Sequence, residues 1–199
     1  MNYLAHLHIA EHCQSSLLGN LLGDFVKGDP THQFPDNIVA GIRLHRFVDS
    51  YTDSHDIVKR AKQFFPEQQK RFAGIALDMY WDHCLASRWN EYHSQSLAEF
   101  CHKAEQVTRL ESEPITVELP AKYLEMTHHM WKGRWIESYA NIENIAYALE
   151  RMAVRRPKFT PLAECHHVLR ARQPELQRLF SSFYDDLLRT VVTSKNFQK

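Results

Sequence analysis

Residues 36–53 read DNIVAGIRLHRFVDSYTD, and apolar positions recur in this stretch at helical spacing. Steps of four, three and four residues place four side chains on one helix face: Ile38, Ile42, His45 and Asp49. That face begins apolar and ends in an imidazole and a carboxylate, which lie one turn apart and are able to reach the same metal ion. The stretch therefore predicts a helix near residues 36–52 that ends in a group of functional side chains.

A second segment, residues 76–85, reads ALDMYWDHCL and also places acids in an apolar helical pattern. Asp78 and Asp82 are one helical turn apart, and His83 follows directly. Two carboxylates this close repel each other unless a cation, an arginine or a shared proton compensates. The pattern predicts a long helix near residues 67–90 that carries part of a site.

The third segment, residues 19–29, reads GNLLGDFVKGD, with Asp24 among leucines and a phenylalanine. We expect a helix that follows Ser15 and runs to about Lys27, with Asp24 among its apolar positions. A buried carboxylate is unfavourable unless it is paired or binds a cation. Pairing with Lys27, three residues later, is the ordinary alternative to a role as metal ligand.

Carboxylates and imidazoles on several helices indicate a metal site inside a helical bundle. Oxygen-rich ligands with a few imidazoles suit Mn²⁺ or Mg²⁺ better than a metal that prefers thiolates. Such an ion activates water and screens the charge of a phosphate, and Arg46 is placed to bind a phosphate oxygen or to pair with a carboxylate. Each piece also has an ordinary interpretation, because a His–Asp pair one turn apart is often only a structural hydrogen bond or a surface pair.

The rest of the chain shows the same helical pattern. Only 6 glycines occur among 199 residues, and neither Asn-Gly nor Asp-Gly is present to indicate a hairpin. Apolar residues recur at helical spacing almost throughout, which predicts about eight or nine helices. The first lies near residues 3–13, and the last three lie near 141–155, 160–172 and 174–194. We therefore predict an all-α, single-domain multi-helix bundle that covers residues 1–199.

Composition and charge argue against several classes of protein. Lysine plus arginine and aspartate plus glutamate balance at 24 each, which indicates no nucleic-acid partner. No long apolar run predicts a membrane span, and the first residues lack the pattern of a signal peptide, so we expect a cytoplasmic protein. The four cysteines are scattered, which favours free thiols over a disulfide framework or a zinc ribbon. The oligomeric state does not follow from the sequence.

Several other polar residues have two interpretations. His6 and His8 are two residues apart, so on a helix at most one of them joins a shared ligand set. The literal His55-Asp56 pair follows other polar residues at a helix start, where a capping role is favoured. A basic cluster is either a solvated face or a docking surface for an acidic protein, and its members are Arg151, Arg155, Arg156 and Lys158.

Taken together, these segments resemble a known family. The stretches that look like acyl carrier protein phosphodiesterase, also called holo-acyl-carrier-protein hydrolyase, are NYLAHLHIA, SSLLGNLLGDFVKG, GIRLHRFVDSYTD, LDMYWDHCLASRW and RMAVRRP. They occur in order over nearly the whole chain. The resemblance implies an HD-like helical fold, related to the HD-type metal-dependent phosphohydrolases.

The resemblance also implies an activity, a cofactor and a partner. The activity is removal of the 4′-phosphopantetheine arm from the serine of holo acyl carrier protein, which yields apo acyl carrier protein and 4′-phosphopantetheine. The favoured ion is Mn²⁺, with Mg²⁺ or another divalent ion as substitute. Because acyl carrier proteins are small and acidic, the basic cluster becomes a candidate docking surface.

Site residues follow from the matching segments, with most weight on Asp24. Metal-ligand candidates are Asp24, His6, His45, Asp49, Asp78 and Asp82, with His8 and His83 on the same segments. Catalytic candidates are Asp24, His45, Arg46, Asp49 and His83. Among these, Asp49 or His83 would orient the attacking water, and Arg46 would neutralise developing charge.

Two other functions remain open. An HD-like phosphohydrolase acting on a small nucleotide or phosphate ester would turn over free small substrates without a carrier protein. A non-enzymatic helical module that binds carrier protein would keep its affinity when Asp24 is replaced by alanine and would form no metal-dependent product.

Overall fold

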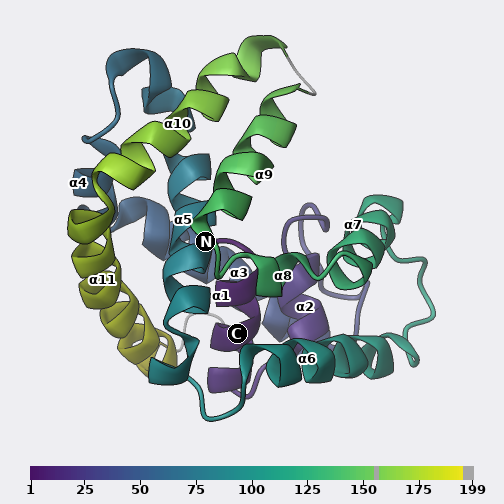
Figure 1. Ribbon diagram of the computed structural model, residues 1–199. Helices are drawn as coiled ribbons and strands as arrows, with labels where there is room; N and C mark the ends of the chain where they lie inside the picture. Colours follow the sequence, from purple (N-terminus) through teal and green to yellow (C-terminus); the bar gives the residue numbers. More distant parts are fainter. Residues whose placement is uncertain (155–156, 195–199) are drawn as a thin grey trace.

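A computed structural model describes residues 1–154 and 157–194, which form helices joined by loops (Figure 1). The α-helices are α1 (Tyr3–His12), α2 (Leu17–Leu22), α3 (Asp36–Ser54), α4 (Asp56–Lys62), α5 (Ala73–Ser87), α6 (Leu97–Ser112), α7 (Ala121–Lys132), α8 (Trp135–Ser138), α9 (Ile142–Val154), α10 (Thr160–Ala171) and α11 (Gln173–Thr193). The short 3₁₀ helices are η1 (Glu67–Phe72), η2 (Trp89–Glu91) and η3 (Pro157–Phe159). Within these ranges nine α-helices have seven residues or more and no strand occurs, which confirms the all-α prediction of about eight or nine helices.

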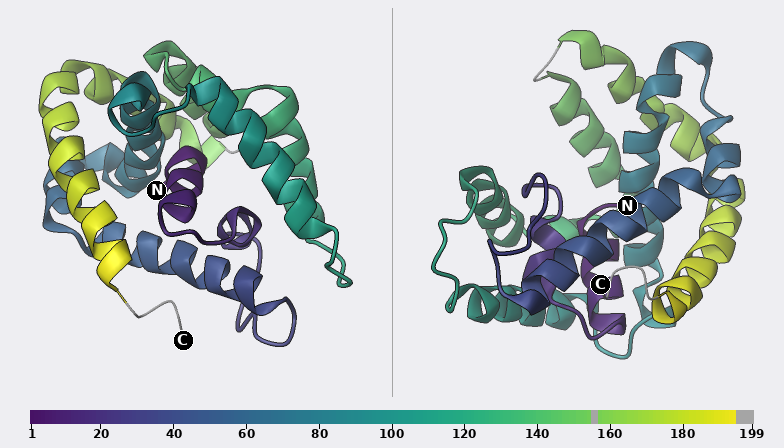
Figure 2. Two further views of the ribbon diagram at one scale, coloured as in Figure 1. Left: turned by 90° about the horizontal axis from the view of Figure 1, so that it is seen from below. Right: turned by 180° about the vertical axis from the view of Figure 1, so that it is seen from behind.

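The first helix, α1, lies at the centre of the molecule. Every residue from Leu4 to Ala10 is buried, including His6 and His8. Helices α2, α3, α5 and α11 pack against α1, and Figure 2 shows it enclosed between α3, α6 and α11. A helix segment that is buried on all sides has no solvent-facing stripe, so the two buried histidines need partners inside the protein.

Helices α5 and α11 build the core beside α1. Trp81 of α5 and Phe180 of α11 are fully buried, and their rings stack with centroids 5.7 Å apart. Helices α9 and α10 pack on each other and on α5, and in Figure 1 they form a hairpin that rises beside it. This packing fixes α5, which carries three of the predicted site residues, against the central helix.

Two glycines bring α2 and α3 into backbone contact. A Cβ atom on Gly19 would lie 2.4 Å from the carbonyl oxygen of Ile38, and a Cβ atom on Gly41 would lie 2.9 Å from the Cα atom of Gly19. Both distances are too short for any side chain, so only glycine allows the two helices to approach this closely. The contact carries the end of α2 alongside the polar end of α3.

The helix predicted to reach Lys27 ends at Leu22 instead. Gly23 packs against the ring of His45, and the N–H groups of Phe25 and Val26 both donate to the carbonyl of Leu22 at 2.9 Å. These bonds tighten the chain into a turn after α2. Asp24 consequently lies in a turn. The prediction that it lies on the apolar face of a helix is wrong.

The long helix predicted for residues 67–90 divides into η1, α5 and η2. The buried side chains of η1 are Gln69 and Phe72, which are three residues apart, the spacing of a 3₁₀ helix.

Between α3 and α4, the Nδ1 atom of His55 accepts the N–H of Ile57 at 3.2 Å. The predicted cap at the His55-Asp56 pair is therefore confirmed, with the imidazole as the capping group.

The four cysteines are free thiols, as the scattered spacing predicted. Burial raises the pKa of the Cys13 thiol to about 11, which disfavours a reactive thiolate at neutral pH. Across residues 1–154 and 157–194, none of the helices combines the length and apolar character that crossing a membrane requires.

Candidate functional site

Helices α1 and α3 bring two histidines and a carboxylate together. The Nε2 atom of His6 lies 3.1 Å from Oδ1 of Asp49, and the Nε2 atom of His45 lies 3.1 Å from Oδ2 of the same residue. The two imidazole rings stack with their centroids 3.9 Å apart. Among the described residues, these three form the one group whose ligand atoms all lie within 4.8 Å of one another. The structure thus brings together the predicted His45–Asp49 pair and adds His6 from the central helix.

Asp24 joins this cluster from the turn after α2. Its Oδ1 atom lies 3.4 Å from Nε2 of His45, and its side chain is 55% exposed. Gly23 allows this approach, because a Cβ atom on Gly23 would lie 2.2 Å from Cγ of His45. His45 consequently lies between two carboxylates, one from the turn and one from its own helix.

The two histidines differ in charge although their rings are in contact. Burial, together with the neighbouring His45, lowers the pKa of His6 to about 4. Burial also acts to lower the pKa of His45, but hydrogen bonds to Asp24 and Asp49 outweigh it and raise that pKa to about 9. Burial of Asp49 is likewise outweighed by the hydrogen bonds from His45 and His6, which hold its pKa well below the usual range. The cluster therefore stabilises one positive charge between two carboxylates.

A second positive charge lies beside the cluster. The amino group of Met1 is 3.4 Å from Oδ1 of Asp49 and 3.1 Å from Oδ1 of Asp78. Desolvation opposes this charge, but the two carboxylates raise the pKa of the amino group to about 10. Asp78, a predicted metal ligand, thus lies next to Asp49 but outside the group of three convergent ligands.

Two clefts meet at the cluster. The α5/α9 cleft has a volume of about 270 Å³ and is lined by the first residues together with α3, α5 and α9, including Asp49, Thr52, Ile75, Asp78, Met79 and Met152. The loop cleft has a volume of about 490 Å³ and is lined by the turn after α2 and by α3, including Gly23, Asp24, Lys27, Gly28, His45 and Arg46. Asp24 and Asp49 line both clefts. A group held at these two carboxylates is consequently accessible from two sides.

The donor set fits a divalent metal ion. Two imidazole nitrogens and carboxylate oxygens converge, and the convergent group contains no thiol. Nitrogen and oxygen donors in this combination suit Mn²⁺ and related divalent ions. The same carboxylates already attract the charged ring of His45 and the amino group of Met1, so the local field favours a cation. The residues that would hold an ion are His6, His45, Asp49 and Asp24, and His45 would bind it as the neutral imidazole, with the ion in place of the proton.

Asp82 has a structural role in place of the predicted ligand role. Its Oδ2 atom accepts the N–H of Leu4 at 2.8 Å, and its Oδ1 atom accepts the N–H of Ala5 at 3.0 Å. These N–H groups lie in the first turn of α1, where a helix provides no internal acceptor. The carboxylate is fully buried, and burial raises its pKa to about 7. Asp82 therefore anchors α1, and with it His6, on α5.

Replacing Asp82 with alanine is expected to lower the free energy of unfolding by about 2–4 kcal/mol, because two buried N–H groups lose their acceptor. Asp82→Asn keeps one acceptor oxygen and should lose roughly half of that amount. Urea denaturation followed by circular dichroism measures both effects. Asp78→Ala is the matched control, because Asp78 lies one turn earlier on α5 and its side chain is 40% exposed. Equal stability of the two alanine variants would contradict the capping role.

His83 and His8 point away from the cluster. The Nδ1 atom of His83 lies 2.9 Å from the carbonyl oxygen of Tyr139 and not at the cluster. The position of His83 therefore gives no support to its predicted role in orienting water. The Nδ1 atom of His8 lies 2.7 Å from the hydroxyl of Tyr184. Of the two histidines, the structure therefore places only His6 in the cluster, which agrees with the expectation that at most one of them faces a shared ligand set.

Arg46 holds the loop that follows Asp24. Its guanidinium donates to the carbonyl oxygens of Val26 and Gly28, both at 2.8 Å. These bonds use two of the five N–H donors of the guanidinium, for which the sequence had predicted a phosphate or a carboxylate as partner. Lys27 is a second cation in the loop cleft, and its Nζ atom donates to the backbone carbonyl of Asp24, not to the carboxylate.

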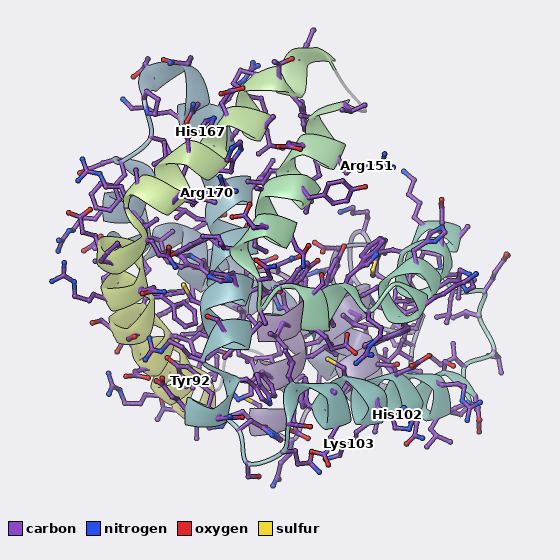
Figure 3. The ribbon with its side chains drawn as sticks, viewed as in Figure 1. Tyr92, His102, Lys103, Arg151, His167 and Arg170 are labelled. Carbon is purple, nitrogen blue, oxygen red and sulfur yellow. The ribbon has the colours of Figure 1, made fainter. Side chains whose placement is uncertain are left out.

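The predicted docking cluster is described only in part. Arg151 lies on α9, and Lys158 lies in η3; both are exposed. Figure 3 labels Arg151 on α9. Arg155 and Arg156 lie outside the described residues.

Some features of the site have little signal in the sequence. Gly23 is four residues after Gly19. Small residues at this spacing on a helix indicate that another helix approaches closely, but they do not identify that helix. Thr52 is buried, and among the described residues its Oγ1 atom has no hydrogen-bond partner. No pattern distinguishes Thr52 from an ordinary helix residue, and only the packing of α3 against the first residues shows it in the cleft.

The family model and three individual proteins that match this chain carry the same name. The family model described as acyl carrier protein phosphodiesterase matches residues 1–187. The chain is 40% identical over 196 residues to the acyl carrier protein phosphodiesterase of Pectobacterium atrosepticum, covering 98% of this chain and 100% of that protein. It is 42% identical over 189 residues to the protein of that name from Yersinia enterocolitica, covering 94% and 96%. For the Escherichia coli O6:K15:H31 protein the identity is 37% over 190 residues, covering 94% and 96%. No solved structure matches significantly, so the relation to HD-type enzymes stays a prediction.

Proposed function

The chain belongs to the acyl carrier protein phosphodiesterase family, and from this premise we propose that it hydrolyses the phosphodiester linking 4′-phosphopantetheine to the serine of holo acyl carrier protein. The products are apo acyl carrier protein and 4′-phosphopantetheine. One observation carries the proposal: His6, His45, Asp49 and Asp24 converge where two clefts meet.

The reaction exchanges one ester bond of the phosphate for a bond to water. The water oxygen bonds to phosphorus, the bond between phosphorus and the serine oxygen breaks, and the serine oxygen takes up a proton. A phosphodiester carries a negative charge that repels an incoming oxygen nucleophile. The site therefore has to provide positive charge at the phosphate and an acceptor for a proton of the water.

We assign a divalent ion, Mn²⁺ first and Mg²⁺ as the alternative, to His6, His45, Asp49 and Asp24. Such an ion, when bound, supplies positive charge to a phosphate oxygen and lowers the pKa of a coordinated water. The chemistry of the donor set and the accumulation of cations around Asp49 support this assignment. The protein fixes the donors through the Asp82 anchor on α1 and through the close contact between α2 and α3.

Asp24 is the side chain best placed to orient the attacking water. Both imidazoles engage the carboxylate of Asp49, whereas Asp24 contacts only His45 among the members of the cluster. Its half-exposed carboxylate lines both clefts, so one oxygen is free to accept a hydrogen bond from water. This assigns to Asp24 the role that the sequence had assigned to either Asp49 or His83.

In this proposal the carrier protein docks beside the exposed side chains of Arg151 on α9 and Lys158 in η3. Arg151 is exposed and directly precedes Met152, which lines the α5/α9 cleft, and Lys158 is exposed in η3. Positive charge beside a cleft attracts an acidic protein and increases its encounter rate. Docking there would bring the modified serine close to the cluster.

Incubating the purified protein with holo acyl carrier protein and Mn²⁺ is expected to decrease the mass of the carrier by the mass of the arm. Free 4′-phosphopantetheine should appear in equal amount, and intact-protein mass spectrometry follows both products. Removal of divalent ions with a chelator should abolish the reaction, and added Mn²⁺ should restore it, because the ion lowers the pKa of a coordinated water, which neither His45 nor the amino group of Met1 does.

Two outcomes would contradict the proposal. Turnover of small phosphate esters without any reaction on holo carrier protein, unaffected by Arg151→Glu, would favour a small-molecule phosphohydrolase. Tight binding of carrier protein without any product, with or without Mn²⁺, would favour a binding module. The cytoplasmic location and the absence of a nucleic-acid partner stay predictions.

A further inference from the structure

We propose that the two clefts separate the two halves of the substrate: the α5/α9 cleft receives the pantetheine arm, and the loop cleft faces the serine of the carrier protein, whose body extends from Lys27 to the exposed Arg151 and Lys158. This inference rests on the proposed function. It adds a binding site for the arm and a direction for the substrate across the cluster.

The first step concerns the connectivity of a phosphodiester. Its phosphorus carries two ester branches, one to the serine and one to the arm, and these leave the phosphate in different directions. Asp24 and Asp49 line both clefts, so a phosphate held at these carboxylates has one cleft on each side. Each branch then enters a different cleft.

The second step concerns the walls of the α5/α9 cleft. Its lining includes the carboxylates of Asp24, Asp49, Asp53 and Asp78, and its apolar part consists of Ile75, Met79 and Met152. Met79 is buried, whereas Ile75 and Met152 are each 38% exposed. Exposed apolar side chains that border a cleft are typical of ligand-binding walls. The dimethyl and methylene groups of the arm match this surface. The volume of about 270 Å³ is close to the lower end of the range of about 300–1,000 Å³ for small-molecule sites.

The third step concerns a buried hydroxyl in the same cleft. Thr52 is 2% exposed and lines the α5/α9 cleft, yet its Oγ1 atom has no hydrogen-bond partner among the described residues. A buried polar group without a partner is unfavourable unless a ligand satisfies it. The arm contains two amides and a hydroxyl, and each of them is able to donate to or accept from this threonine.

The loop cleft has a different character. Its lining shares Asp24 and Asp49 with the α5/α9 cleft, but it adds the side-chain cations Lys27 and Arg46, and Val26 is its one aliphatic member. Its volume of about 490 Å³ is the larger of the two. A wider opening with side-chain cations suits the serine-bearing segment of a folded acidic protein, which cannot thread into a narrow cleft.

Two substrates test this assignment: holo acyl carrier protein, and a short-arm carrier in which a propyl phosphate replaces the pantetheine phosphate on the same serine. Met152→Ala is expected to lower kcat/KM about 5- to 10-fold for holo carrier protein, because the contact between the arm and the exposed Met152 side chain is lost. For the short-arm carrier the same variant should match wild type. Free pantetheine should inhibit wild type competitively, and Met152→Ala should raise its inhibition constant by the same factor.

Two further variants complete the test. Val154→Ala is the matched control, because Val154 lies on the same helix, is 80% exposed and does not line the cleft. Lys27→Glu should lower kcat/KM by the same factor for both substrates, since it acts on the carrier side. Equal effects of Met152→Ala on both substrates, or a loss confined to the full arm in Lys27→Glu, would overturn the assignment while leaving the hydrolase function intact. A wild-type protein that released no arm from holo carrier protein would overturn the proposed function itself, and this inference with it.

Discussion

Replacing Asp49 with alanine is expected to lower kcat/KM for holo acyl carrier protein by about 10³-fold or more. The carboxylate of Asp49 contacts the Nε2 atoms of both His6 and His45, each at 3.1 Å, so its removal breaks the shared connection of the donor set. Loss of one donor also weakens the binding of the ion, and we expect the affinity for Mn²⁺ to fall about 10- to 100-fold. Steady-state kinetics with the mass assay measures the first effect, and titration calorimetry measures the second.

Asp56→Ala is the control for this substitution. Asp56 belongs to the literal His55-Asp56 pair, but its side chain is 93% exposed and pairs with Lys59 at 3.1 Å, three residues later on α4. We expect its activity and its Mn²⁺ affinity to equal those of wild type. The opposite pattern, with loss of activity in Asp56→Ala and retention in Asp49→Ala, would place the metal centre at the literal pair and refute the cluster. Circular dichroism of both variants separates a loss of chemistry from a loss of fold.

Periodicity along single helices was enough to predict one part of the site. The step of four residues from His45 to Asp49 holds on any regular helix, and the structure shows the pair in contact at 3.1 Å. The same reasoning correctly separated His6 from His8, because residues two apart on a helix face in different directions. In both cases the relevant geometry lies within one element.

Tertiary packing decided the parts that the sequence could not predict. The acids of α5 share one pattern, yet Asp82 lies beneath the start of α1 and satisfies its N–H groups, whereas Asp78 faces the cleft. Nothing within α5 distinguishes these two environments. Asp24 was predicted on an apolar helix face, but α2 ends two residues earlier, and the chain turns there through hydrogen bonds to the carbonyl of Leu22. Its importance followed from the family resemblance, and its position followed only from the fold.

Replacing Gly23 with alanine is expected to lower kcat/KM by about 10²-fold or more, although the change adds a single methyl group. The new Cβ atom would lie 2.2 Å from Cγ and 2.3 Å from Cδ2 of His45, far inside van der Waals contact. Either the ring rotates away from Asp24 and Asp49, or the end of α2 moves away from α3. Both movements separate donors that have to converge. Overpacking of this kind should also lower the free energy of unfolding by about 1–3 kcal/mol.

Gly74→Ala distinguishes this steric effect from a general effect of glycine substitution. A Cβ atom on Gly74 of α5 would find its nearest neighbours at 3.7 Å, at the flexible end of the Lys62 side chain. Alanine is the better helix former, so this variant should keep full activity and gain up to about 1 kcal/mol of stability. Full activity in Gly23→Ala would mean that the packed orientation of His45 is not needed for the reaction. A loss of Mn²⁺ affinity in Gly23→Ala alone, with both variants folded, would instead tie the backbone contact between α2 and α3 directly to the metal centre.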